Sequence, residues 1–148
     1  MITNMRKIAR RAASLGATAA TAAAIVLVAA PSANAATWYN DPPTKASGVT
    51  TVASAPLPGG GTVQIRQGKY GNYMYVWGRV SSPASKYNSG HTMTFVVGGC
   101  DGSIDSKSKD INRTTYTAAA RRNKDCTYYT RVQTSTTSKV VASTSYNP

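Results

Sequence analysis

Cationic and aromatic side chains suited to ligand binding are concentrated in one stretch, residues 62–80, TVQIRQGKYGNYMYVWGRV. Aromatic rings stack on sugar rings or bases, and neighbouring cations hold anionic groups. Arg66 opposite Trp77 would also form a cation–π pair. The binding residues predicted from this stretch and from a basic turn at residues 121–125 are Arg66, Tyr73, Tyr75, Trp77, Arg79, Arg121 and Arg122.

A single β-hairpin is predicted to position these side chains. Gly71-Asn72 suits a two-residue turn, because glycine adopts the positive φ that such turns need. Closing the hairpin there places Val63 opposite Val80 on one face and Arg66 opposite Trp77 on the other. This register collects aliphatic residues on one face and aromatic and cationic residues on the other, whereas a slip by one residue would mix them.

Two outcomes are open for the aromatic face of this hairpin. In a two-layer fold only one face of the hairpin has to be buried, and the aliphatic face is suited to that. Trp77 and Tyr75 would then be exposed and could form a binding platform. Tryptophan and tyrosine are also good core residues, so a second layer could instead cover them.

Catalytic residues are scarce in this sequence. General acid–base catalysis usually takes a histidine or a pair of tuned carboxylates. His91 is the one histidine, glutamate is absent, and three of the five aspartates share one segment. A Ser-His-Asp triad could be assembled from the many serines, but no G-x-S-x-G elbow occurs. The composition therefore favours a protein that is not an enzyme.

Metal and cofactor sites are not predicted. Two cysteines and one histidine cannot complete a four-ligand zinc site. The oxygen ligands that one segment could offer calcium belong to Asp101, Ser103, Asp105 and Asp110. Their spacing departs from an EF-hand loop, and Lys107 and Lys109 intrude. A solvated loop is the preferred interpretation of this segment, and no cofactor is expected.

Residues 1–35 have the features of a secretory signal peptide. A basic region with four cations precedes the uncharged, alanine-rich stretch 16–30, and Ala33-Asn34-Ala35 forms an A-x-A cleavage site. The apolar stretch falls short of the roughly 20 residues that a membrane span needs. The pair Arg10-Arg11 is a feature of twin-arginine export signals, but no Phe-Leu pair follows it, so export by the Sec pathway is preferred. A secreted, extracellular protein without a transmembrane segment is expected.

The mature chain, residues 36–148, is basic and suited to β structure. Of the 17 Lys and Arg, four lie in the leader, which leaves 13 against five aspartates and a formal net charge of +8. Such a charge favours anionic partners outside the cell, including wall polymers, acidic polysaccharide and, nonspecifically, nucleic acid. Leu57 is its one leucine, so the usual helix builders are missing, whereas Thr, Tyr and Val are abundant.

The predicted fold is all-β, a single small sandwich or partly closed barrel of about seven antiparallel strands. An N-terminal arm, 36–46, precedes a β domain, 47–148, and Pro42-Pro43 favours an extended path in this arm. Trp38 and Tyr39 are expected to dock on the domain. Strands are expected within 47–55, 62–80, 91–97, 114–120, 126–133 and 139–146, and residues 101–112 are expected to be an exposed loop.

Cys100 and Cys126 are predicted to form a disulfide, because both lie in the exported part of the chain. The bond would close a loop of about 26 residues and contribute roughly 3 kcal/mol in the chain-entropy model. It would tie the end of the strand containing Phe95 to the start of the strand containing Tyr128.

The signal peptide and the Thr/Tyr/Gly-rich domain resemble small secreted β-rich proteins of actinobacteria, many of uncharacterised function. The resemblance is carried by the pattern VQIR…YVWGRV, which covers about twenty residues. It implies export and a non-enzymatic role, and it assigns no functional residues.

Two functions are compatible with these features. The first is an extracellular binding protein for anionic wall polymer or glycan, acting through the aromatic face and the basic turn. The second is a protein-directed inhibitor or antagonist of a secreted target, with the disulfide-tied segment 101–125 as bait, because constraint lowers the entropy cost of binding.

We expect the mature protein to begin at Ala36, because the A-x-A site ends at Ala35. The intact mass of protein collected from culture fluid checks this cleavage. A secreted species that retains residues 1–35 would contradict it.

Overall fold

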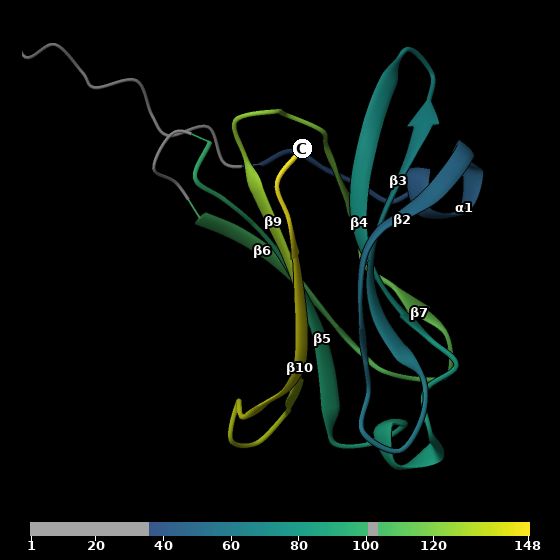
Figure 1. Cartoon of the computed structure of the whole chain (residues 1–148), viewed down its shortest axis with the longest axis vertical. Helices are drawn as coiled ribbons and strands as arrows, with labels where there is room; N and C mark the ends of the chain where they lie inside the picture. The colour runs from purple at the N-terminus through teal and green to yellow at the C-terminus, as the bar shows by residue number, and fades with distance from the viewer. Residues whose placement is uncertain (1–35, 101–103) are drawn as a thin grey trace, which may run out of the picture. The chain divides into compact units, whose positions relative to one another are not determined.

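The computed structural model describes residues 36–100 and 104–148, and the predicted signal peptide lies outside them. Two antiparallel sheets pack face to face as a sandwich that is not a closed barrel (Figure 1). The first sheet, sheet A, has the order β1 (Trp38–Tyr39), β8 (Ala119–Arg121), β4 (Tyr73–Ser81), β3 (Thr62–Tyr70) and β2 (Ser47–Pro56), with β7 (Thr115–Tyr116) also pairing β4.

The second sheet, sheet B, has four strands. Its order is β10 (Val140–Tyr146), β9 (Thr127–Thr134), β5 (His91–Gly98) and β6 (Ile104–Asp110). Two short helices accompany the sheets, α1 (Pro42–Lys45) and the 3-10 turn η1 (Ser85–Tyr87). The all-β prediction is confirmed. The described residues form ten strands rather than about seven, because the sheets include two-residue strands and an additional edge strand, β6.

The register predicted for the central hairpin is confirmed along its whole length. Val63 pairs with Val80, Ile65 with Gly78, and Arg66 with Trp77. The aliphatic residues of β3 and β4 therefore face sheet B. Val63, Ile65, Val76 and Val80 are fully buried there, as the alternation predicts.

The core lies between the two sheets. Phe95 of β5 stacks on Tyr128 of β9 with centroids 6.0 Å apart, and both rings pack with Ile65 of β3. Gly78 permits the closest approach, because a Cβ atom there would lie 2.9 Å from the Thr130 hydroxyl of sheet B. The glycine of the Trp-Gly-Arg pattern is thus required by the packing of one sheet on the other.

The disulfide Cys100–Cys126 is present and joins the end of β5 to the start of β9, with the two Cα atoms 4.2 Å apart. Both half-cystines pack against the core cluster that contains Phe95 and Tyr128. The bond therefore ties together the two inner strands of sheet B at the end where the basic turn, residues 121–125, leads into β9.

The prediction of an exposed loop over residues 101–112 was wrong for its central part. Residues 104–110 form β6, which pairs with β5 along its full length. The Thr94 and Ser108 hydroxyls also lie 2.8 Å apart across this pair. Because β6 is an edge strand with polar residues on both faces, it lacks the apolar alternation that identifies strands in a sequence. Residues 101–103 lie outside the described part.

The calcium alternative is not supported by the described residues of this segment. Asp105 and Asp110 lie at opposite ends of β6, about 16 Å apart at roughly 3.3 Å per residue, and their odd spacing directs them to opposite faces. Asp101 and Ser103 lie outside the described residues. No group of three or more potential metal-binding side chains occurs within residues 36–100 and 104–148.

The strand expected over residues 114–120 is interrupted. Thr117 lies between β7 and β8, and its hydroxyl accepts a hydrogen bond from the Gly78 N–H at 3.0 Å. Its own N–H donates to the Gly78 carbonyl at 3.1 Å. A side-chain oxygen thus replaces one backbone carbonyl of the ladder, which separates the segment into two short strands.

The N-terminal arm docks on the domain, as expected. The Trp38 indole N–H donates to the Asp105 carboxylate at 3.0 Å, and its ring lies edge-on to Phe95. The extended path predicted at Pro42-Pro43 is wrong, because these prolines begin α1. Proline is tolerated in the first turn of a helix, where a backbone N–H has no helical partner. Within the described residues, no helix has the length and hydrophobicity of a membrane span.

We expect Cys100→Ala to lower the free energy of unfolding by about 2–4 kcal/mol, because the closed loop no longer restricts the unfolded chain. Chemical denaturation of the oxidised wild type and the variant measures the difference. Cys126→Ala serves as the matched variant and should give a similar loss. Equal stability of the wild type before and after reduction would contradict the prediction.

Candidate functional site

Most of the predicted binding residues lie on the outer face of sheet A, but the N-terminal arm covers the middle of that face. Trp77 is 1% exposed and Tyr75 is 5% exposed. Tyr39 contacts Tyr75 edge-on with ring centroids 5.0 Å apart, and Ala46 and Val49 pack against the same cluster. The open platform that was one of the two expected outcomes is therefore absent, and these two rings form a small second core.

Gly68 explains why this second core can form. It lies on β3 directly opposite Tyr75, on the face that carries Trp77. A Cβ atom at Gly68 would lie 3.0 Å from both Ala46 and Val49 and 3.1 Å from the Trp77 ring. The missing side chain leaves space into which the indole ring and the arm pack. The arm divides the predicted face, so its arginines form two separate clusters.

The first cluster, called the end cluster below, consists of Tyr73, Arg121, Arg122, Lys124 and Tyr146. The Arg121 guanidinium carbon lies 3.4 Å from the centroid of the Tyr73 ring. The Arg122 guanidinium carbon lies 6.0 Å from the centroid of Tyr146. Such cation–π contacts hold the guanidinium groups while leaving their N–H donors available to a ligand.

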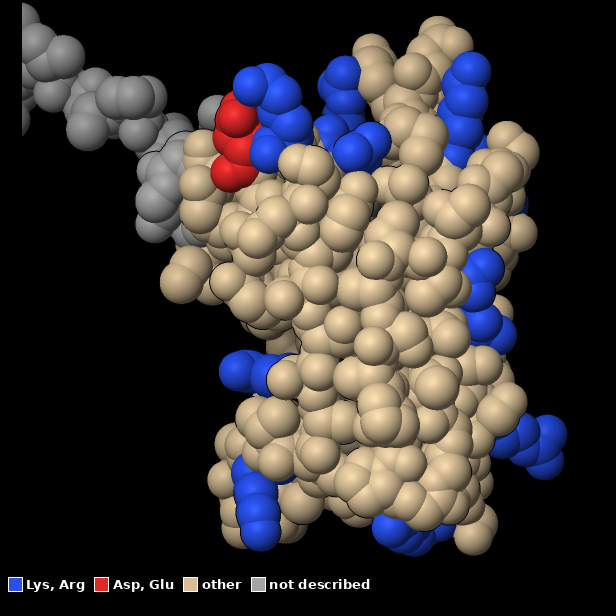
Figure 2. Space-filling view, viewed as in Figure 1, with Lys and Arg blue, Asp and Glu red and all other residues tan. Residues whose placement is uncertain are grey.

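The end cluster is exposed at one end of the sandwich. Tyr73 is 46% exposed, and the three cations are exposed as well. In Figure 2, cationic side chains lie at the upper end together with acidic atoms, where Figure 1 shows the β3–β4 turn and the connection that leads into β9, and other cationic side chains lie along the right side and at the lower end. A shallow hollow of about 480 Å³ is lined by Arg121, Arg122, Asn123 and Lys124.

Buried Tyr128 positions the backbone of this turn. Its hydroxyl accepts a hydrogen bond from the Asn123 N–H at 2.7 Å and lies within donor range of the Asn123 carbonyl at 3.3 Å. Burial raises the pKa of Tyr128, so the phenol stays protonated and keeps its donor. Asn123 also accepts from the Asp125 N–H, and the disulfide anchors Cys126. The turn is therefore fixed before any ligand arrives.

The second cluster, called the face cluster below, consists of Gln64, Arg66, Arg79 and Tyr116 on the opposite side of the arm. Arg79 donates to the Gln64 amide oxygen at 3.2 Å, and its guanidinium carbon lies 5.5 Å from the Tyr116 centroid. The predicted cation–π pair of Arg66 with Trp77 is not formed, although the two residues are cross-strand neighbours. The Trp77 ring instead packs beneath Ala46 and Val49.

Electrostatic repulsion is built into the face cluster. Burial, and then the neighbouring charge of Arg79, lower the pKa of Arg66 from its ordinary value, although the group remains charged. The Nε atoms of both arginines are buried and have no hydrogen-bond partner among the described residues. An anion bound beside the two guanidinium groups would offset the repulsion between them.

Carboxylates do not neutralise either arginine pair. The ion pairs found among residues 36–100 and 104–148 join Lys45 to Asp41 and Lys124 to Asp125. In this part of the chain, no carboxylate lies within 4.0 Å of Arg66, Arg79, Arg121 or Arg122. Both clusters thus have the composition of anion-binding sites.

Sequence reasoning missed three of the contributing side chains. Tyr116 and Tyr146 stack with arginines that are distant in the sequence, and Gln64 orients Arg79. Tyr146 pairs with Tyr128 between β10 and β9, and no sequence pattern indicates this pairing. His91 lies away from these groups, with Nδ1 3.0 Å from the Ser89 carbonyl and its ring edge-on to Tyr87.

Comparison of the chain with protein-family models, with curated proteins and with solved structures found no match.

We expect Trp77→Ala to lower the free energy of unfolding by about 3–5 kcal/mol, because it leaves a cavity beneath the arm. Thermal denaturation of the two purified proteins measures the difference. Tyr73→Ala is the matched control, because this ring is half exposed, and it should cost less than about 1 kcal/mol. Near-native melting of Trp77→Ala would contradict the burial.

Proposed function

We propose that this protein is a secreted, non-enzymatic binding protein for an anionic cell-wall polymer or glycan, and that the end cluster is its main contact. The observation that carries the proposal is the arrangement of Arg121 and Arg122. Both are exposed, both are held over tyrosine rings, and neither has a carboxylate partner among the described residues.

The physical argument rests on the entropy and desolvation costs of binding. A flexible arginine loses side-chain entropy when it binds, and stacking on Tyr73 or Tyr146 reduces that loss in advance. Charge-assisted hydrogen bonds to carboxylate or phosphate are stronger than neutral ones. The fixed turn and the exposed Tyr73 ring therefore suit a chain of sugar rings that carries acidic groups.

The face cluster supports the same proposal. Arg66 and Arg79 repel one another, and an acidic group would remove that repulsion. The formal net charge of +8 on residues 36–148 would attract a polyanion over the distance of about 8–10 Å that salt screening permits. Secretion is supported by the predicted leader, by the disulfide and by the resemblance to small secreted β-rich proteins.

The inhibitor alternative receives less support. A bait needs an exposed loop, but residues 104–110 of the segment 101–125 form β6, and further residues form β7 and β8. Among the described residues of this segment, the basic turn is the part that resembles a bait loop. If this protein is immobilised and then retains a single other protein from culture fluid in stoichiometric amount, the result would favour the inhibitor alternative.

We expect Arg121→Gln with Arg122→Gln to weaken retention on a polygalacturonate column and on purified wall material by about 5- to 30-fold at low salt. This range follows from about 0.5–1 kcal/mol for each exposed charge. The difference should shrink as salt is raised, because screening already suppresses the contribution.

The matched control is Arg131→Gln with Lys139→Gln, which removes the same charge from exposed positions on β9 and on the connection that leads into β10. This control should lose much less retention than the end-cluster variant. Equal losses in the two double variants would show that net charge alone drives binding, and would contradict a defined site. Melting temperatures of both variants should stay near that of the wild type.

A further inference from the structure

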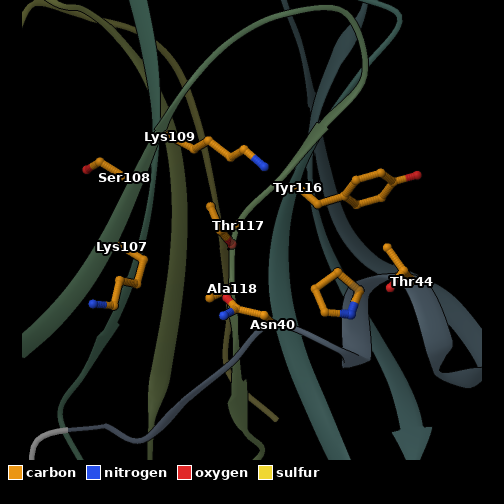
Figure 3. A pocket seen from close by; sticks show the side chains of 9 residues that line it. Asn40, Thr44, Lys107, Ser108, Lys109, Tyr116, Thr117 and Ala118 are labelled. Atoms are coloured by element: carbon orange, nitrogen blue, oxygen red, sulfur yellow. The ribbon is translucent and has the colours of Figure 1, made fainter.

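A groove lies where the two sheets diverge, beside the free edge of β6. β6 pairs only with β5 in sheet B, so its other side has no strand partner among the described residues. Lys107 pairs with Phe95, and Lys109 pairs with Met93. Cross-strand partners share a face of the sheet, and Phe95 and Met93 point into the core. Both lysines therefore leave β6 on the side that faces sheet A, and both side chains are exposed. The Lys109 ammonium group extends toward Thr117, whereas that of Lys107 points away from it (Figure 3).

Three parts of the chain line this groove, which has a volume of about 420 Å³. The arm contributes Asn40 and Thr44, β6 contributes Lys107 and Lys109, and the β7–β8 segment contributes Tyr116 and Thr117. Figure 3 shows Lys109 extending from β6 toward Thr117 and Tyr116. The volume lies within the lower range of small-ligand sites, about 300–1,000 Å³.

The charge in this groove is uncompensated. None of the lining residues is acidic. Asp110 adjoins Lys109 in the sequence, and Asp105, on the same side of β6 as the two lysines, accepts a hydrogen bond from Trp38. Neither carboxylate, nor any other in the described part of the chain, lies within 4.0 Å of either lysine. Lys107 lies 5.8 Å from the centroid of the Trp38 ring. Two exposed ammonium groups that line one groove, neither of them within 4.0 Å of a described carboxylate, favour an anionic ligand.

The remaining lining residues indicate what else the ligand carries. The side chains of Asn40 and Thr44 offer hydrogen-bond donors and acceptors. Tyr116, Pro43 and Ala118 supply apolar surface, and the tyrosine ring is held by Arg79. Two cations, a few polar groups and a ring surface together match a polyhydroxylated ring that carries one acidic group.

We propose that this groove binds a single acidic sugar unit, a hexose that bears a carboxylate or a phosphate. Its anionic group contacts Lys107 and Lys109, its hydroxyls face Asn40 and Thr44, and its ring packs on the side formed by Tyr116. This inference depends on the proposed function in one respect: the sugar is taken to be a unit of the acidic polymer. The groove then recognises the individual unit, while the end cluster binds the charged chain.

An acidic extended peptide is the competing occupant, because it could pair with the free edge of β6. Such a strand would be held mainly by backbone atoms of β6. The groove is instead lined by side chains from the arm and from both sheets, which favours a compact ligand. Inward-pointing lysines also protect a free edge from pairing with another chain, and this role alone would give no sugar affinity.

The test uses the mature chain, residues 36–148, with isothermal titration of three short probes: digalacturonate, galactose 6-phosphate and neutral digalactose. We expect at least one of the two acidic probes to bind and the neutral probe to bind at least tenfold more weakly. Binding of only the carboxylate or only the phosphate probe identifies the acidic group. Absence of binding by both, or equal binding of the neutral probe, would overturn the proposal.

Variants assign the binding to this groove. Lys107→Gln with Lys109→Gln should weaken the acidic probe at least tenfold, whereas Arg131→Gln with Lys139→Gln should change it less than twofold. Arg121→Gln with Arg122→Gln should leave the short probe unaffected, so failure of the polymer proposal and failure of this one are distinguishable. An unchanged affinity of the Lys107/Lys109 variant for the acidic probe would overturn the assignment. The assignment would also be overturned if tetra-aspartate bound to this groove and the sugar probes did not.

Discussion

The register of the β3–β4 hairpin is the constraint on which the rest of the structure depends. It directs Val63, Ile65, Val76 and Val80 toward sheet B, and it places Gly78 beneath Thr130, where a side chain would hold the sheets apart. A shift by one residue would exchange the two faces and direct charged and aromatic residues into the core. The packing of the hairpin against sheet B and the positions of Arg66 and Arg79 on its outer face both follow from this one alignment.

The arm determines what becomes of the hairpin's other face. Burying a large aromatic side chain contributes roughly 1.5–3 kcal/mol, so a sheet face rich in rings is more stable when it is covered. Tyr39 and Ala46 of the arm provide that cover together with Val49 of β2, and Gly68 leaves the space for it. The arginines at the borders of the covered area cannot be buried without a counter-charge, so they remain at its edges. Stability and binding thus use different parts of one face.

The described part of the chain leaves most of its cations unpaired. Lys45 and Lys124 have carboxylate partners within 4.0 Å, and tyrosine or tryptophan rings take the place of a partner for several others. Rings hold a cation without neutralising it, so the charge stays available to an external anion. The end cluster, the face cluster and the β6 groove share this feature, and they differ in exposure and shape.

Local alternation and composition alone determined the all-β class, the hairpin register and the Cys100–Cys126 bond, because each depends on side-chain period, on turn residues or on cysteine count. Only the tertiary structure decided that Trp77 is core, since its cover comes from residues far away in the sequence. It also decided that residues 104–110 form an edge strand, because their pairing is made by backbone atoms that leave no apolar pattern. The contacts of Arg79 with Tyr116 and of Arg122 with Tyr146 likewise join distant segments, and no local pattern encodes such meetings.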